Sequence, residues 1–412
     1  MRIAFVINQF PPNITAGLGR YAELITPHLA RDHELEIYTL NDGQQPVDEQ
    51  VDGITVYRPR TPLLRGRRLN RTRRAEFLLL ALSVVVSNLR YVLRLRRGKR
   101  PDLVAVHDST NFLSGLLCHY VLRLPVVFHV HTTEYGVAPQ RSITDPLNLF
   151  AALERWLARI SRRVVVATPE VRDQVVAAGW TRTPIDVVPL GGTFEPVLAG
   201  LDRQSLRAAA AARRLELGLS EADRVLLFVG RIERQKGVYQ LLEAMRAAAA
   251  AVPGLHLVIV GEGDELGVRR IANSAGLRGR VLTSGRFVQG RELLEYYELA
   301  DACVFPSLFE PFGLVATEAM ALGRATILGD GFSRIFLGPD PARPAARFVR
   351  ASEPADIARG VIEVMTGTAL RRALGDRGER FVRENLSWDR AAADTIEAYR
   401  AALKPRRGAV KP

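Results

Sequence analysis

The chain has 412 residues, of which 47% are hydrophobic, and its 57 lysine and arginine residues exceed its 44 acidic residues to give a formal charge of +13. This length predicts two or three domains with substantial apolar cores. Residues 58–100 hold fourteen bases and one acid, Glu76, so this segment alone accounts for the net charge, which excludes an evenly basic surface; two cysteines, Cys118 and Cys303, fit no disulfide, zinc or redox spacing and favour a reducing cytoplasm.

The first expected strand, residues 3–7, is an apolar run that is too short for the core of a signal peptide. The longest apolar stretch, residues 77–86, covers about half of the ~18 residues that a membrane span needs. We therefore expect a cytoplasmic protein that does not cross a bilayer.

Short β-rich runs alternate with helical patterns along the chain, which is typical of parallel sheets covered by helices. In the first half, strands are expected at residues 3–7, 34–38, 54–57, 103–106, 126–130, 164–167 and 186–188. In the second half they are expected at residues 225–229, 257–260, 281–283, 302–305 and 325–327. The fold class is therefore α/β, with two Rossmann-like doubly wound domains over 1–190 and 223–389 and a linker over 191–222. Ligands of such sheets bind beyond the carboxyl ends of the strands.

The loop after the first strand contains Gly17 and Gly19, just before a helix expected from about Tyr21. Glycines let the backbone approach a phosphate closely, and the free N–H groups of a helix N-terminus favour an anion. The loop is compatible with an anion site, although an ordinary strand-to-helix turn can contain the same glycines.

The strand at 126–130 runs into His131, so that His129 and His131 project on the same face. Such a pair is half of a metal site, but no Cys, His or acid cluster at ligand spacing completes it, and no metal is expected. One alternative is a buried structural histidine. The functional alternative is that His131, at the carboxyl end of the strand, contacts substrate.

After the strand at 225–229, Arg231 and Lys236 lie on one loop. An arginine fork and a lysine point charge suit a diphosphate. The alternative is a solvated loop in which the two bases have no function.

The segment FPSLFEPFGLVATEAMALG, residues 305–323, has two carboxylates eight residues apart across a loop and a helix start, Glu310 and Glu318. An ionised carboxylate only accepts hydrogen bonds, which suits sugar or ribose hydroxyls. The N–H groups of Phe312, Gly313 and Leu314 start the helix and suit anionic or hydroxyl oxygen. Glu318 could also be only a favourable charge near a helix N-terminus.

Taken together, these segments resemble retaining glycosyltransferases of family 4, the glycosyl transferases group 1, which have the GT-B fold. The resemblance spans nearly the whole chain and rests on FVGRIERQKG, on the Glu310 to Glu318 segment, on His107-Asp108 and PVVFHVH at strand ends, and on Ser387-Trp388 before the last helix. It implies an interdomain cleft and a helix over 390–404 that packs back on the first domain. The usual paired glycines of the first loop are Ala16-Gly17 here, and the usual Gly-Gly-x-Pro-Glu loop is replaced by residues 329–344.

Carried over residue by residue, the resemblance implies that Arg231 and Lys236 neutralise the diphosphate of a nucleotide sugar, with Gly17 closing over it. Glu310 would bind the hexose hydroxyls and Glu318 the ribose diol, and backbone groups near Phe287 would read the base. His131 would lie beside the transferred sugar at the acceptor face. Neither a cofactor nor a metal would be required, because the cations stabilise the leaving diphosphate.

The function expected is transfer of a hexosyl unit, with retention, from a UDP- or GDP-linked sugar to a hydroxyl of a sugar, lipid or small-molecule acceptor. One alternative is a cytosolic glycosyltransferase acting on a small-molecule or natural-product acceptor, and another is a nucleotide-sugar epimerase on the same scaffold. A phosphorylase is disfavoured by the scarcity of lysine. A nucleic-acid binder is disfavoured because no aromatic residues interleave with the bases.

The basic segment 58–100 combines arginines with an apolar helix, which suits an anionic membrane surface. Our hypothesis is peripheral contact with the inner face of the membrane, to reach a lipid-linked acceptor. The alternative is an arginine-rich loop and a core helix in an enzyme acting on a small acceptor. The residues expected to contact membrane or acceptor are Arg65, Arg67, Arg68, Arg71, Arg73 and Arg74.

Overall fold

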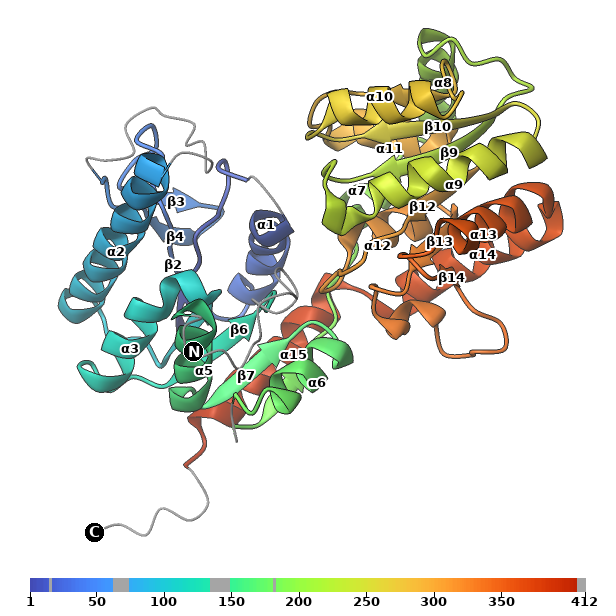
Figure 1. The fold of residues 1–412 in the computed structure, drawn as a ribbon. Coiled ribbons are helices and arrows are strands. Elements are labelled where there is room, and N and C mark those ends of the chain that lie inside the picture. Colours follow the sequence, from blue (N-terminus) through green and yellow to red (C-terminus); the bar gives the residue numbers. More distant parts are fainter. Residues whose placement is uncertain (15–16, 62–73, 134–148, 181–182, 406–412) are drawn as a thin grey trace. The chain divides into compact units, whose positions relative to one another are not determined.

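The computed structural model describes residues 1–14, 17–61, 74–133, 149–180 and 183–405 (Figure 1). The chain forms two compact units. The first comprises Met1–Leu190 with the C-terminal helix α15 (Trp388–Leu403), and the second comprises Gly191–Ser387. Each contains a twisted sheet of the α/β class, so the expected pair of Rossmann-like sheets is confirmed.

The first unit has a sheet whose strands run in the spatial order β3-β4-β2-β1-β5-β6-β7-β8. All neighbours are parallel except β3 and β4. The strands are β1 (Arg2–Val6), β2 (Glu34–Tyr38), β3 (Asp48–Val51), β4 (Ile54–Tyr57), β5 (Leu103–His107), β6 (Val126–Val130), β7 (Arg163–Val166) and β8 (Ile185–Val187).

The helices of the first unit follow the strands in the alternating pattern of a doubly wound sheet. Right-handed crossovers on the two sides of β1 place α1 on one face and α3 and α5 on the other. They are α1 (Gly17–Ala30), α2 (Arg74–Arg97), the 3₁₀ turn η2 (Ser109–Asn111), α3 (Phe112–Tyr120), α5 (Leu149–Ile160) and α6 (Pro169–Ala177).

The second unit has a parallel sheet in the order β11-β10-β9-β12-β13-β14. Its strands are β9 (Arg224–Val229), β10 (Leu255–Val260), β11 (Val281–Thr283), β12 (Ala302–Phe305), β13 (Ala325–Gly329) and β14 (Arg347–Val349). Its helices and 3₁₀ turns are α7 (Glu195–Leu198), α8 (Arg203–Glu216), η3 (Arg234–Lys236), α9 (Val238–Ala251), α10 (Glu265–Ser274), α11 (Gly290–Leu299), α12 (Leu314–Ala321), η4 (Arg334–Leu337), α13 (Pro354–Thr366) and α14 (Thr368–Asn385).

The strands hold the core because helices cover both faces of each sheet, so their side chains are buried on both sides. Every residue of β5, β6 and β12 is buried, which matches their near-continuous valine, alanine and phenylalanine content. Helices therefore need only one apolar stripe each, and the loops at the strand ends are left to carry polar groups.

Each sheet has one point where the chain reverses its direction along the sheet. In the first unit it lies between β1 and β5, and in the second between β9 and β12. At such a switch point the loops leave neighbouring strands in opposite directions and open a crevice, which is where doubly wound sheets bind ligands.

Three features differ from the sequence-based expectations. Residues 191–222, expected to be a linker, instead belong to the second unit, where Leu206 and Ala210 of α8 are buried and α8 packs on α11. Strands β3 and β14 were not predicted. Helix α1 begins at Gly17 rather than near Tyr21.

Among the described residues, no helix is long and apolar enough to cross a membrane.

Candidate active site

The switch point of the second unit holds Lys236, after β9, and Glu310, after β12. The Lys236 ammonium donates a hydrogen bond of 2.5 Å to Oε2 of Glu310, and both side chains are largely buried. These two residues, expected to bind the diphosphate and the hexose of one donor, are therefore side by side. A cation and a carboxylate in contact at a switch point can each change partner when an anionic, hydroxylated ligand binds.

Two glycines set the backbone around this pair. Gly237 follows Lys236 with φ +70°, and a Cβ there would lie 1.8 Å from the carbonyl oxygen of Pro306. Gly313 precedes α12 with φ +96°, and its Cβ would meet the Phe332 ring at 2.2 Å. Only glycine fits both positions, so the loops after β9 and β12 can approach each other closely enough to join Lys236 to Glu310.

The remaining cation of the loop, Arg231, is mostly exposed and forms an ion pair of 2.9 Å with Glu233. Phe287 is half-exposed, and its backbone N–H donates to the Glu262 carboxylate at 3.2 Å. The backbone group expected to read a base thus has a protein partner in the absence of ligand. Phe312 is buried, while Gly313 and Leu314 form the start of α12, where backbone N–H groups lack helical partners.

Glu318 lies on the second turn of α12 and is 7% exposed. The Tyr297 hydroxyl donates to its Oε2 at 2.7 Å. Burial raises the pKa of Tyr297, so the phenol keeps its proton and can donate. The structure thus places Glu318 on the helix that follows the Glu310 loop, with one carboxylate oxygen already held by the protein.

In the first unit, Gly17 and Gly19 lie in the first turn of α1, which follows β1 at the switch point. Gly19 is buried, and a Cβ there would lie 3.1–3.2 Å from Gln9 and Ile14. The start of α1 therefore packs tightly on the loop after β1. The N–H groups at its N-terminus can donate hydrogen bonds to an anion.

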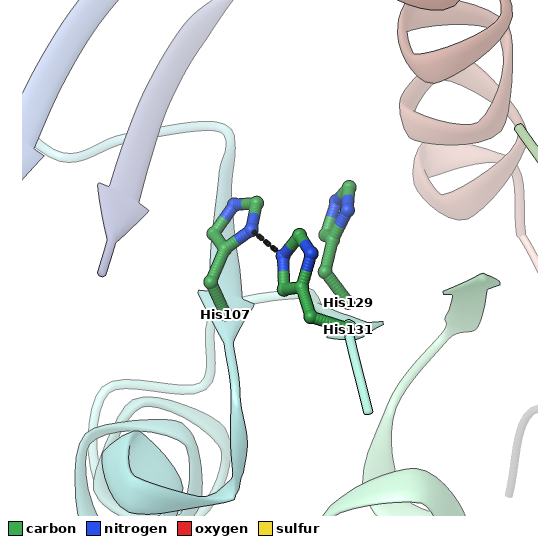
Figure 2. A group of neighbouring side chains, drawn as sticks. All are labelled: His107, His129 and His131. Carbon is green, nitrogen blue, oxygen red and sulfur yellow. Dashed lines mark hydrogen bonds between the residues drawn. The ribbon is translucent and has the colours of Figure 1, made fainter. Parts of the chain in front are cut away.

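The histidines form a larger group than the sequence indicated. His107, the last residue of β5, lies beside His129 and His131, and the possible ligand atoms of the three lie within 4.8 Å of one another (Figure 2). Burial lowers the pKa of His107 and His129 well below the usual range and that of His131 to about 4. All three rings are therefore neutral at pH 7.

Three further residues at the switch point of the first unit, Asn8, His107 and Asp108, have no individual role predicted from the sequence. Asp108 has φ +67°, which is rare outside glycine, and burial raises its pKa to about 6. Asn8, after β1, donates to Thr110 at 2.5 Å, and its side-chain oxygen is buried with no hydrogen-bond partner in the part of the chain that the structure describes. Strained backbone and unpaired polar atoms concentrate at functional sites, so these residues mark the switch point as a site. The signal in the sequence was their position directly after strands.

Arg65, Arg67, Arg68, Arg71 and Arg73 lie outside the described residues. Arg74 is the first residue of α2, and its side chain is not described. The expectation that these arginines contact a membrane or an acceptor therefore stays a prediction.

Comparisons with known proteins match both halves of the chain. Residues 211–381 match the family described as glycosyl transferases group 1, and residues 16–191 match a glycosyl transferase 4-like domain. The match to the first half ends at residue 191, where the second structural unit begins, and the match to the second half starts at residue 211.

Similar proteins cover three quarters of the chain or more. An uncharacterized glycosyltransferase of Methanocaldococcus jannaschii is 27% identical over 98% of this chain and 99% of its own length. A D-inositol 3-phosphate glycosyltransferase of Nocardia farcinica is 31% identical over 75% of this chain and 68% of its own. Among solved structures, an Anabaena protein in complex with UDP and glucose has a TM-score of 0.69 at 16% identity, with 97% of this chain and 100% of that chain covered. At that identity the likeness shows the fold alone.

Proposed function

The chain belongs to the glycosyl transferases group 1 family and is a glycosyltransferase with the GT-B fold, and from this premise we propose that it moves a hexosyl unit, with retention, from a UDP- or GDP-linked sugar to a hydroxyl acceptor. The observation that carries the proposal is the contact of Lys236 with Glu310 at the switch point of the second sheet. Both residue types are those that a nucleotide sugar requires, and both stand where such sheets bind nucleotides.

The Lys236–Glu310 ion pair provides a way to bind the donor. When the diphosphate enters, it replaces Glu310 as the partner of Lys236, and exposed Arg231 can turn from Glu233 to the same phosphates. The released Glu310 carboxylate then accepts hydrogen bonds from hexose hydroxyls. Two ion pairs within the protein are thus exchanged for contacts with the ligand, in which the two cations pair with the diphosphate and Glu310 accepts hydrogen bonds from neutral hydroxyls.

The chemistry follows from where charge develops. As the bond between the anomeric carbon and the phosphate oxygen breaks, negative charge grows on the diphosphate, and Lys236 and Arg231 stabilise it. The acceptor oxygen bonds the anomeric carbon on the same face, and its proton passes to the leaving phosphate oxygen. In this proposal the two cations supply the stabilisation that a divalent metal supplies elsewhere, so transfer requires neither metal nor cofactor.

Helix α2 supports the further proposal that the enzyme works at the cytoplasmic face of a membrane. Its outward side carries four large exposed apolar residues. Its buried side carries Tyr91, Val92 and Leu95, which belong to the core of the first unit, together with the polar Ser83, Ser87 and Asn88. The helix is therefore apolar on both sides, whereas an ordinary surface helix is polar on its outward side. The exposed apolar residues, here called the α2 face, are Leu82, Val85, Leu89 and Leu93.

Hydrogen bonds to the neighbouring helix α3 fix the buried side of α2, so that its leucines on the other side face outward. Asn88 accepts hydrogen bonds from the backbone N–H and hydroxyl of Ser114 on α3, at 2.9 and 2.6 Å. Two further exposed aromatic residues, Tyr120 at the end of α3 and Trp156 on α5, approach each other within 3.5 Å. Exposed leucines with tyrosine and tryptophan are the side chains that partition into a membrane interface.

Charge complements the α2 face. Arg96, Arg97, Lys99 and Arg100 at its C-terminal end are exposed, and each base near an anionic headgroup layer contributes about 1 kcal/mol. Arg58 is instead buried in contact with Glu49, and Arg94 pairs with Glu36 and Asp48, so these two bases of the segment support the fold. A lipid-linked acceptor is the substrate that such a surface would serve.

A thermal-shift screen against UDP- and GDP-hexoses tests the donor. A donor that binds at 100 times its Kd stabilises the fold by about 2.7 kcal/mol, and a Lys236→Met variant should lose this shift. The absence of a shift with every nucleotide sugar tried would contradict the proposed donor class.

A further inference from the structure

The three imidazoles at the ends of β5 and β6 do not point at a common centre. The rings of His107 and His129 are stacked, with centroids 4.2 Å apart and planes 25° from parallel (Figure 2). Because imidazole lone pairs lie in the ring plane, those of stacked rings run side by side. The arrangement instead isolates one in-plane contact, between Nδ1 of His107 and Nε2 of His131 at 3.0 Å.

This contact joins two neutral rings, so one ring must donate and the other accept. Each neutral imidazole carries one proton, and its position on either nitrogen decides which ring donates. The direction of the bond therefore fixes the tautomer of His131, the histidine that the family resemblance places beside the transferred sugar.

The surroundings of His107 decide the direction. His107 is fully buried, and its Nε2 atom has no hydrogen-bond partner among the described residues. Buried donors without a partner are rarer in proteins than acceptors without one. The proton of His107 is therefore on Nδ1, which contacts Nε2 of His131, and not on the unpartnered Nε2. His107 Nδ1–H then donates to Nε2 of His131, and His131 carries its own proton on Nδ1.

The exposed part of the cluster is the opposite edge of His131. Among the described residues, Nδ1 of His131 has no hydrogen-bond partner, and the ring is held from the side by Tyr21, edge to face at 4.6 Å. A small pocket is lined by Tyr21, His129 and His131.

We infer that His107 is a positioning residue, which holds His131 in the Nδ1–H tautomer and so makes His131 a hydrogen-bond donor to an oxygen of the sugar or acceptor, not a base. The tautomer rests on the first unit alone, whereas its use in transfer rests on the proposed function. His129 has a different role, because its Nε2 pairs with the Tyr399 hydroxyl on α15 at 2.9 Å and so ties the C-terminal helix to the sheet.

Nitrogen NMR of the full chain with labelled histidine tests the inference without any substrate. His107→Asn places an amide N–H near the former Nδ1, whereas His107→Gln places its amide near the former Nε2 and leaves the Nδ1 position empty. We expect His131 to carry its proton on Nδ1 in the native chain and in His107→Asn, and to lose this preference in His107→Gln. His129→Gln, which removes a stacked ring but not the bond to His131, is the matched control and should leave the tautomer unchanged.

Turnover gives the second readout. His107→Gln should lower kcat about 10- to 100-fold, the loss typical when the partner that orients a functional histidine is removed, with the KM for donor unchanged and activity recovered in His107→Asn. The inference is overturned if His131 of the native chain carries its proton on Nε2. It is also overturned if His131 keeps the Nδ1–H tautomer in His107→Gln. If the tautomers are as expected but no sugar is transferred, the proposed function fails and the positioning role stands.

Discussion

Lys236 and Glu310 meet at 2.5 Å although they follow different strands of the second sheet and are 74 residues apart in the chain. The pair is largely buried, so each charge depends on the other for compensation. The same dependence allows a diphosphate and a sugar to take over the two partners. Stability and function of this site can therefore be separated by mutation.

We predict that Lys236→Met and Glu310→Gln each reduce transfer by about 100-fold or more, the usual cost of removing one charged stabiliser of a transition state. Each single change also leaves its partner charge uncompensated and should lower the melting temperature of the second unit.

The double variant, Lys236→Met with Glu310→Gln, is the internal control. It leaves no unpaired charge, so its stability should recover while its activity stays lost. Recovery of activity together with stability would mean that the pair serves only the fold.

Gly237→Ala should destabilise the second unit far more than Gly276→Ala. Both glycines have nearly the same positive φ, +70° and +73°, so both variants carry the same backbone strain, roughly 1 kcal/mol. Only the Gly237 variant also places a Cβ 1.8 Å from Pro306, whereas a Cβ at Gly276 meets nothing within 4 Å. Urea unfolding followed by circular dichroism measures the difference, and equal losses would exclude a close approach at Gly237.

The first unit should lose stability as the pH falls from 7 to 5. Because the pKa of His131 is lowered to about 4 from 6.5, its unfolded form binds the extra proton in this window, at a cost of about 2 kcal/mol. His107 and His129 act in the same direction, while the raised pKa of Asp108, about 6, opposes them in part.

Fluorescence isolates this effect, because Trp156, Trp180 and Trp388, the only tryptophans of the chain, all belong to the first unit. The urea midpoint from tryptophan emission should fall between pH 7 and 5, and His129→Gln should flatten the dependence. A midpoint that rises or stays constant over this window would show that the histidines are not neutral in the fold.

Replacing Leu89 and Leu93 by serine should weaken co-sedimentation with vesicles that contain anionic lipid. The matched control is the serine variant of Leu215 and Leu266, which are also exposed, at 76% and 82%, but lie in the second unit. Equal binding of the two variants would exclude the α2 face as a membrane-binding surface and would favour a small, soluble acceptor.

Transfer should persist after dialysis against a chelator, with a rate within about 2-fold of the untreated enzyme, because Lys236 and Arg231 supply the charge that stabilises the leaving diphosphate. Loss of activity on chelation that is restored by Mg²⁺ or Mn²⁺ would contradict this mechanism.

The parts of the fold that could be predicted are those whose amino-acid composition reflects whether they are buried. Strands β2, β4, β6, β11 and β12 have the expected bounds, because β-branched and aromatic runs buried in a sheet differ in composition from their neighbours. Strand β3, Asp-Glu-Gln-Val, was missed because it is a polar edge strand that pairs with only one neighbour. Its structure is imposed by β4 rather than encoded in its own pattern.

The candidate site shows the same division. Arg231, Lys236, Glu310 and Glu318 stand out by residue type and spacing after strands. The third histidine did not, because the pairing of β5 with β6, which sets His107 opposite His129, is a property of strand order and not of spacing along the chain. The apolar character of α2 was visible in the sequence, but which of its leucines face outward was not, because apolar residues surround the helix and leave its buried side undefined.

The proposed transfer is tested most directly by supplying the enzyme with UDP- and GDP-hexoses labelled in the sugar, together with lipid and small-molecule extracts, and following the label. We expect label to move from one donor to a hydroxyl acceptor with retained configuration, and Lys236→Met and Glu310→Gln to abolish the movement. Undiminished transfer in both variants, or no transfer from any nucleotide sugar by an enzyme that is fully folded, would contradict it.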